Sequence, residues 1–157
     1  MPKKKKKEEM IEPPSAIEGV LTREALIELL NEDLRLEYTA MIQYIQHSAV
    51  MKGAQYRSIQ QELVVHAAEE HQHALLLANE IDYLGGTPAV DVRHVVTSED
   101  QVAMLQQDLV GEKVAITRYK ERMKQAEALG EYALKRVLED ILTQEQEHER
   151  DILDALG

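Results

Sequence analysis

Apolar residues recur in steps of three and four along four stretches of the chain, which is the period at which side chains return to one face of an α-helix. These stretches cover residues 22–51, 59–84, 102–126 and 134–155. The pattern predicts an all-α protein built from four long helices.

The connections between these stretches predict how the helices are arranged. Gly53 and Gly130 end the first and third stretches and allow only tight links. We therefore expect the first helix to lie antiparallel to the second, and the third antiparallel to the fourth. Ser98 and Gln101 are spaced as a capping box that would open the third helix.

The connection between the second and third helices is different in kind. Residues 86–97 include Pro88 and have no helical period, and they could extend over about 40 Å. A helix of about thirty residues is about 45 Å long. The second and third helices can therefore be parallel, joined by a long crossover, although an up-and-down bundle remains the alternative.

The N-terminal segment, residues 1–21, differs from the rest of the chain. Lys3 to Lys7 are followed by glutamates and by two prolines, and no apolar period is present. We predict a Lys-rich, disordered tail over residues 1–21 and a single bundle domain over residues 22–157.

Polar residues occupy the centre of every apolar stripe, where leucine or isoleucine would be expected. A Glu lies at the centre of the first and third stripes, and a Glu-x-x-His motif lies at the centre of the second and fourth. The six residues are Glu37, Glu70, His73, Glu112, Glu145 and His148.

The six residues form a repeated pattern at compatible heights. The separation in sequence between Glu37 and Glu70 equals that between Glu112 and Glu145. Measured from the glycine between the paired helices, the positions differ by at most three residues, or about 4.5 Å of helical rise. All six side chains can therefore meet in the middle of the bundle.

Four carboxylates inside an apolar bundle need compensating charge, because an unpaired buried charge costs several kcal/mol or takes up a proton. Two divalent cations would balance four carboxylates, and Glu-x-x-His places an oxygen and an imidazole one turn apart on one face. The chain has no Cys, so any metal must bind to Glu, Asp or His. We predict a two-metal site.

These motifs resemble those of ferritin-like proteins of the bacterioferritin type, in which Glu residues and Glu-x-x-His motifs from four helices hold two metal ions. The resemblance spans residues 22–156 and includes the Leu84-Gly85-Gly86-Thr87-Pro88 segment. It implies a ferritin-like four-helix bundle with a di-iron centre, in which Glu70 and Glu145 bridge the metals. Glu37 with His73, and Glu112 with His148, would complete the two ends.

The resemblance also implies a function, namely a ferroxidase that oxidises Fe(II) with oxygen or peroxide for iron storage or detoxification. The ligand set alone tolerates manganese or zinc as well as iron. The alternative enzyme is a peroxide-reducing di-metal oxidoreductase of the rubrerythrin type. Such proteins usually carry a Cys-ligated module and a further Glu at the position of Ala115, and both are missing from this sequence.

Two departures from the bacterioferritin pattern change the expectations. His71 stands where the haem-ligating Met usually follows the Glu of the second helix, which argues against haem binding. The segment after His148 is too short for the fifth helix of the large cage, so we expect a homo-oligomer that is a dimer or a small cage.

Several other residues near the six have more than one interpretation. Tyr44 and Tyr119 each lie two helical turns after a central Glu. They are either ordinary core residues or hydrogen-bond donors that orient the carboxylates and can also donate electrons. His66 or Glu69 would be either an accessory ligand or an ordinary core or interface residue. The three histidines that we assign to the surface or to an interface are His47, His71 and His94.

Charge and hydropathy limit the remaining classes of function. The net charge of −11 argues against general nucleic-acid binding, so DNA binding through Lys3 to Lys7, as in DNA-protecting mini-ferritins, is the less favoured hypothesis. No apolar run reaches the length of a membrane span, and no hydrophobic signal segment follows the N-terminal lysines. We expect a cytoplasmic protein that does not bind membranes.

Overall fold

The computed structural model describes residues 22–157, and these residues form helices and no strand. The predicted Lys-rich tail, with its DNA-binding hypothesis, lies outside the described residues. The prediction of an all-α protein is confirmed. The four long helices are α1 (Arg23–Val50), α2 (Arg57–Tyr83), α3 (Gln101–Ala128) and α4 (Tyr132–Leu156), and a short 3-10 helix, η1 (Ala54–Tyr56), precedes α2.

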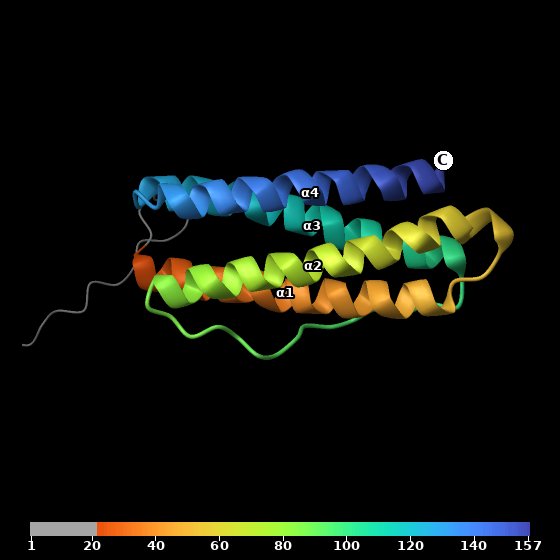
Figure 1. Cartoon of the computed structure of the whole chain (residues 1–157), viewed down its shortest axis with the longest axis horizontal. Helices are drawn as coiled ribbons and strands as arrows, with labels where there is room; N and C mark the ends of the chain where they lie inside the picture. The colour runs from red at the N-terminus through yellow and green to blue at the C-terminus, as the bar shows by residue number, and fades with distance from the viewer. Residues whose placement is uncertain (1–21) are drawn as a thin grey trace, which may run out of the picture.

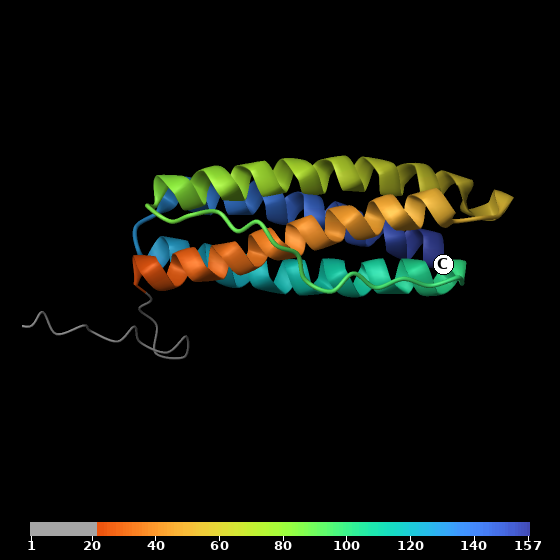
Figure 2. The ribbon, with the colours of Figure 1, turned by 90° about the horizontal axis from the view of Figure 1, so that it is seen from below.

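The helices form a bundle in which α1 packs beside α2 and α3 packs beside α4 (Figure 1). The chain turns back after α1 and after α3, so each of these pairs is antiparallel. The segment from the end of α2 to the start of α3 runs along the outside of the bundle and crosses α1 (Figure 2). As a result α2 and α3 are parallel, and the ferritin-like crossover is correct rather than the up-and-down alternative.

Side chains of α1 hold the crossover segment in place. The Asn31 amide donates to the Thr87 carbonyl at 3.0 Å and accepts from the Ala89 N–H at 2.8 Å. Farther along, the Arg93 N–H donates to the Thr39 hydroxyl at 2.7 Å. These bonds satisfy backbone groups that have no partner in regular secondary structure, so the crossover follows a defined path.

The start of α3 differs from the prediction. Asp100 caps this helix, and its carboxylate accepts from the Ala103 N–H at 2.8 Å. Ser98 instead accepts from the Asp100 N–H at 3.0 Å and is not the cap of the expected capping box. A carboxylate directly before the first turn satisfies a free N–H and also interacts favourably with the helix dipole.

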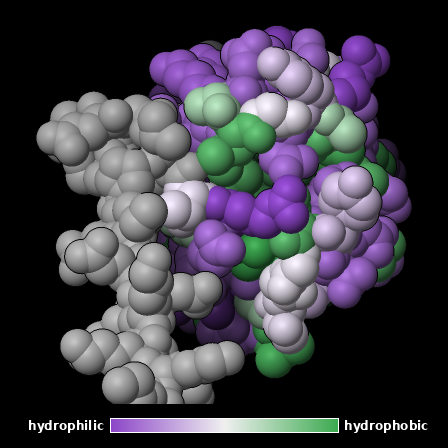
Figure 3. Space-filling view, turned by 90° about the vertical axis from the view of Figure 1, so that its left-hand side faces the viewer, coloured by the Kyte–Doolittle hydropathy of each residue, from purple (hydrophilic) through white to green (hydrophobic). Residues whose placement is uncertain are grey.

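The apolar core consists of two clusters separated along the bundle. One contains Leu30, Ile81 and Leu138, and the other contains Leu63 and Leu105, all of them fully buried. The six polar residues of the stripes lie between these clusters. At the end of the bundle shown in Figure 3, hydrophilic residues surround a few separate hydrophobic ones. Within residues 22–157, no helix has the length and apolar character needed to cross a membrane.

Candidate metal centre

The structure brings all six predicted residues together in the middle of the bundle. Each side chain is buried, with an exposed fraction of 3 % or less. They form two groups of four in which the candidate ligand atoms lie within 4.8 Å of one another. Glu70 and Glu145 belong to both groups. The first group adds Glu37 and His73, and the second adds Glu112 and His148.

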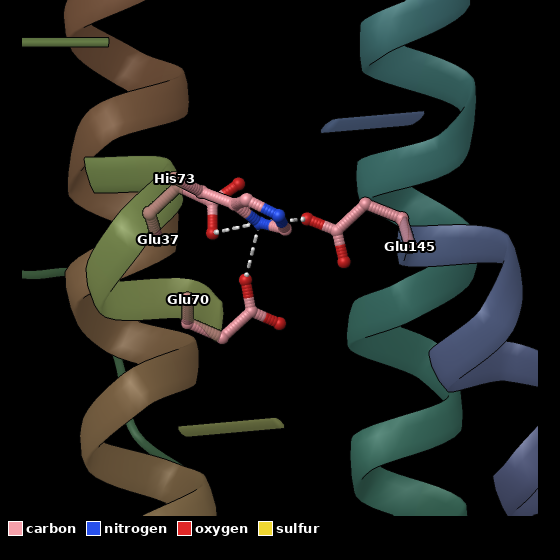
Figure 4. Close-up of side chains that lie close together, drawn as sticks. All are labelled: Glu37, Glu70, His73 and Glu145. Atoms are coloured by element: carbon pink, nitrogen blue, oxygen red, sulfur yellow. Dashed lines mark hydrogen bonds and ion pairs between the residues drawn. The ribbon is translucent and has the colours of Figure 1, made fainter. Parts of the chain in front are cut away.

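In the first group, the carboxylates surround one nitrogen of His73 (Figure 4). Nδ1 of His73 lies 3.1 Å from Glu70 and 3.2 Å from Glu145. The Glu37 carboxylate lies 3.6 Å from the same nitrogen. Three helices therefore supply oxygen and nitrogen donors to one small volume.

The second group repeats this geometry around His148. Its Nδ1 lies 3.1 Å from Glu70, 3.3 Å from Glu112 and 3.4 Å from Glu145. Because Glu70 and Glu145 approach both imidazoles, they occupy the central positions of the arrangement, and the other residues occupy its two ends.

The outer nitrogens of both imidazoles have their own hydrogen-bond partners. Nε2 of His148 lies 2.8 Å from the Glu69 carboxylate, and Nε2 of His73 lies 2.5 Å from the Gln144 carbonyl oxygen. A proton held on Nε2 leaves Nδ1 free to act as a ligand. Glu69, considered as an accessory ligand, thus contacts the outer edge of His148, and Gln144 was missed by the sequence analysis.

The two tyrosines act as donors across the bundle. The Tyr44 hydroxyl donates to Glu112, and the Tyr119 hydroxyl donates to Glu37. Each tyrosine therefore contacts the Glu of the opposite helix rather than the one on its own helix. Both tyrosines are also buried members of the apolar clusters, so their positions agree with both interpretations, as core residues and as donors to carboxylates.

A single interval in sequence, which we call the repeat interval, relates the two halves of the site. It separates Glu37 from Glu112, and it also separates Tyr44 from Tyr119 and His73 from His148. Glu69 and Gln144 are the same interval apart. The repeat interval was a signal that could have pointed to Gln144. Its counterpart Glu69 also directly precedes the Glu of a Glu-x-x-His motif.

The repeat extends to two buried aspartates that the sequence analysis missed, Asp33 and Asp108. The Arg122 guanidinium donates to Asp33 at 2.7 Å. At the equivalent place in the other half, Nδ1 of His47 lies 2.9 Å from Asp108. The assignment of His47 to the surface is therefore wrong, because this side chain is fully buried and is paired with a carboxylate; His71 and His94 are exposed as expected.

Burial and mutual repulsion shift the acid–base properties of the carboxyl groups. Burial, together with the charge of Glu37, raises the pKa of Glu70 to about 8. Burial also raises the pKa of Glu112 and Glu145. Burial alone would raise the pKa of Glu37, but hydrogen bonding to Glu70 and His73 lowers it to about 2. The cluster therefore tends to retain protons when no cation compensates its charge.

Burial has the opposite effect on the pKa of the imidazoles, because their charged form is the protonated one. Burial alone would lower the pKa of His73 and His148, but hydrogen bonds to the surrounding carboxylates outweigh it and raise both values. Each imidazole thus takes a proton in the position where a cation would otherwise balance the negative charge.

Unpartnered oxygen atoms show that the donor set suits metal ions. Among residues 22–157, Oε2 of Glu112 has no hydrogen-bond partner, and the two oxygens of Glu145 lie 3.2 Å and 3.4 Å from imidazole nitrogens without well-aligned hydrogen bonds. Buried polar atoms are normally paired, so such atoms need an explanation. Two divalent ions would satisfy these oxygens, the inward-facing imidazole nitrogens and the four negative charges together.

A pocket of about 270 Å³ between α1 and α3 reaches this centre from the outside of the bundle. Its walls include Glu37, Glu112 and Tyr44 as well as His94 and Val96 of the crossover segment. A small molecule in this pocket would contact the carboxylates of both groups.

Comparison with known proteins gives consistent matches over most of the chain. The sequence profile of the ferritin-like domain family matches residues 27–157. A bacterioferritin of Brucella melitensis is 31% identical over 139 residues, which cover 84% of this chain and 86% of that protein.

Two solved structures share the fold. The dodecameric thioferritin of Bacteroides fragilis, a bacterioferritin-related protein, has a TM-score of 0.81 and 32% identity, covering 90% of this chain and 89% of that one. A ferritin-like diiron-carboxylate protein of Bacillus anthracis has a TM-score of 0.83 and 35% identity, covering 86% of this chain and 97% of that one.

Proposed function

Because the chain belongs to the ferritin-like domain family and has a bacterioferritin among its relatives, we propose that it is a ferroxidase-type di-iron protein. In this proposal it oxidises Fe(II) with oxygen or peroxide and serves iron storage or detoxification. Iron is favoured over manganese or zinc because the Bacillus anthracis structure is a diiron-carboxylate protein.

The observation that carries the proposal is the pair of overlapping ligand groups that share Glu70 and Glu145. Two metal ions held by shared carboxylates can each give up one electron, and this matches the two electrons needed to reduce oxygen to peroxide. Two Fe(II), one O₂ and two protons then yield two Fe(III) and one H₂O₂. With peroxide as oxidant, two Fe(II), one H₂O₂ and two protons yield two Fe(III) and two waters.

The residues of the chain would hold the Fe(II) substrate at two ends of one site. Glu37 with His73 would bind one ion, Glu112 with His148 would bind the other, and the shared carboxylates would lie between them. The Tyr44 and Tyr119 hydroxyls would keep the outer carboxylates oriented through their hydrogen bonds. Oxygen or peroxide would approach through the pocket between α1 and α3.

The direct test is a stopped-flow measurement of Fe(III) absorbance after anaerobic protein with two Fe(II) per chain is mixed with oxygen. We expect rapid oxidation by the wild-type protein and near-background oxidation by the Glu70→Ala, His148→Ala double variant. Glu147→Gln is the matched control because Glu147 lies near His148 in sequence but is not buried. An unchanged rate in the double variant would refute the proposal.

The fate of the iron and the size of the assembly distinguish storage from the peroxide-reductase alternative. We propose a homo-oligomer, a dimer or a small cage, because the related Bacteroides fragilis protein is dodecameric. Light scattering coupled to size exclusion gives the mass, and aerobic loading with excess Fe(II) shows whether mineral accumulates. Peroxide turnover that needs an added reductant, without mineral, would instead support the peroxide reductase.

A further inference from the structure

A third group of metal-binding side chains lies beside the candidate metal centre, toward η1. It consists of Glu62 and His66 of α2 and Asp151 of α4, whose candidate ligand atoms lie within 4.8 Å of one another. Nε2 of His66 lies 3.1 Å from the Asp151 carboxylate. This group shares no residue with the two groups around Glu70 and Glu145.

His66 is the least expected member of this group. It is 1 % exposed, and within the described part of the chain its Nδ1 atom has no hydrogen-bond partner. The hydrogen bond to Asp151, itself a member of the group, is the contact that its ring nitrogens make. Nε2 of this buried imidazole therefore faces the carboxylates, while Nδ1 is a buried polar atom whose lack of a partner needs an explanation.

The internal repeat shows that the fold does not need polar residues at these positions. The counterparts of Glu62, His66 and Asp151 at the repeat interval are Val137, Ile141 and Leu76. Ile141 is fully buried in the apolar core, and the other two pack against that core. The same bundle geometry is therefore filled by three apolar residues in one half and by three metal-binding residues in the other.

The group is accessible to ions from outside. A pocket of about 310 Å³ borders the carboxylates of Glu62 and Asp151, and Asp154 and Ser58 also line it. The side chain of Asp151 is 43% exposed, whereas that of His66 is 1% exposed. An ion entering this pocket would meet the oxygen donors of Glu62 and Asp151, and Nε2 of His66 lies 3.1 Å from the Asp151 carboxylate.

We propose that Glu62, His66 and Asp151 form a third site for a divalent cation, separate from the two-metal centre. One imidazole and two carboxylates favour borderline ions such as Zn²⁺, Co²⁺ or Fe²⁺, with water completing the coordination. The His66 ring stacks on that of His148, with ring centroids 4.0 Å apart, so the third site directly adjoins the centre. This site does not depend on ferroxidase activity.

Zn²⁺ tests the proposal without redox chemistry, through equilibrium dialysis of the full chain followed by elemental analysis at about 0.15 M salt. We expect three Zn²⁺ per wild-type chain and two for the Glu62→Gln, Asp151→Asn variant. The variant Glu70→Gln, Glu145→Gln should keep one. Saturation of the wild type at two, or three ions still bound by Glu62→Gln, Asp151→Asn, would overturn the proposal.

Two further variants separate this site from general surface binding and from misfolding. His66→Ile introduces isoleucine, the residue found at its repeat counterpart, Ile141. This variant should fold normally, which circular dichroism checks, yet it should lose the third Zn²⁺. Glu147→Gln with Glu149→Gln removes two nearby acidic groups outside the site and should retain all three ions. Retention of the third ion by His66→Ile would contradict the assignment. Failure of the two-metal centre alone would appear as one Zn²⁺ in the wild type and none in Glu62→Gln, Asp151→Asn, whereas failure of the ferroxidase proposal alone would leave all three Zn²⁺ bound and abolish only Fe(II) oxidation.

Discussion

The α1–α2 half and the α3–α4 half of the bundle present the same residues to the metal centre but surround them differently. Both supply a Glu, a Tyr and a Glu-x-x-His motif, related by the repeat interval. Around them, Glu69 of one half corresponds to Gln144 of the other, and His66 corresponds to Ile141. The shared residues are those that a two-metal site requires, and the residues that differ can give the two ends different properties.

Glu69 and Gln144 each contact an imidazole of the centre, so the difference between them changes the surroundings of that imidazole. His148 has a carboxylate at its outer nitrogen, whereas His73 has a neutral amide oxygen there. A carboxylate acceptor makes an imidazole a stronger metal ligand than a neutral acceptor does. We infer that the end of the centre formed by His148 and Glu112 binds metal more tightly than the end formed by His73 and Glu37.

The largest expected effect is a loss of Fe(II) oxidation on removal of either shared carboxylate. The loss should be equal for Glu70, from the α1–α2 half, and for Glu145, from the α3–α4 half. Glu70→Ala and Glu145→Ala should each lower the rate of Fe(II) oxidation by more than about 100-fold, since each removes a ligand from both ends. Stopped-flow absorbance gives the rates, and circular dichroism gives the folded fraction. A folded Glu145→Ala protein with nearly normal activity would show that the halves are not equivalent at their centre.

The next effect is a loss of stability of the metal-free protein as the pH rises. Glu70 has a pKa of about 8 in the folded protein against an ordinary value of 4.5, and the pKa values of His73 and His148 are also raised. The folded state therefore binds more protons than the unfolded state between about pH 5 and pH 8, so the free energy of unfolding falls across this range.

Thermal unfolding in the presence of a chelator measures this pH dependence. The melting temperature should fall from about pH 6 to about pH 8.5, and saturating Zn²⁺ should remove most of the fall because the ions replace the bound protons. Glu70→Gln should make this fall less steep, and the raised pKa values of His73 and His148 should sustain the remainder. A melting temperature that rises over this range would contradict the assignment of protons to the cluster.

The smallest effect tests the difference between the two ends. Glu69→Gln makes the surroundings of the two imidazoles alike and should weaken the tighter of the two central sites by about 10-fold. Gln144→Glu should strengthen the weaker site. Zn²⁺ competition with a chromophoric chelator measures both affinities, with Glu147→Gln as control. If Glu69→Gln left both affinities unchanged, the proposed inequality of the ends would be wrong.

The sequence was sufficient to predict the four helices and the six central residues. Their apolar stripes follow the helical period, and glutamates such as Glu37 and Glu112 stand out because leucine or isoleucine is expected at those positions. The crossover was also predictable, because a segment of this length without a helical period can span a long helix.

The residues that the sequence analysis missed depend on contacts between helices. His47 is buried because Asp108 of α3 lies opposite it, and Gln144 matters because the outer nitrogen of His73 points at it. Such pairs depend on helix rotation and side-chain rotamers, which a periodic pattern in one segment does not specify. The repeat interval was the available signal, since it pairs Asp33 with Asp108 and Glu69 with Gln144.

Anomalous X-ray diffraction from crystals loaded with Zn²⁺ or, without oxygen, with Fe(II) tests the two-metal centre most directly. We expect two peaks about 3.5–4 Å apart in the middle of the bundle. One should be coordinated by His73 and Glu37, the other by His148 and Glu112, and both by Glu70 and Glu145. A single central peak, or peaks only at exposed carboxylates while these side chains remain unligated, would contradict the account.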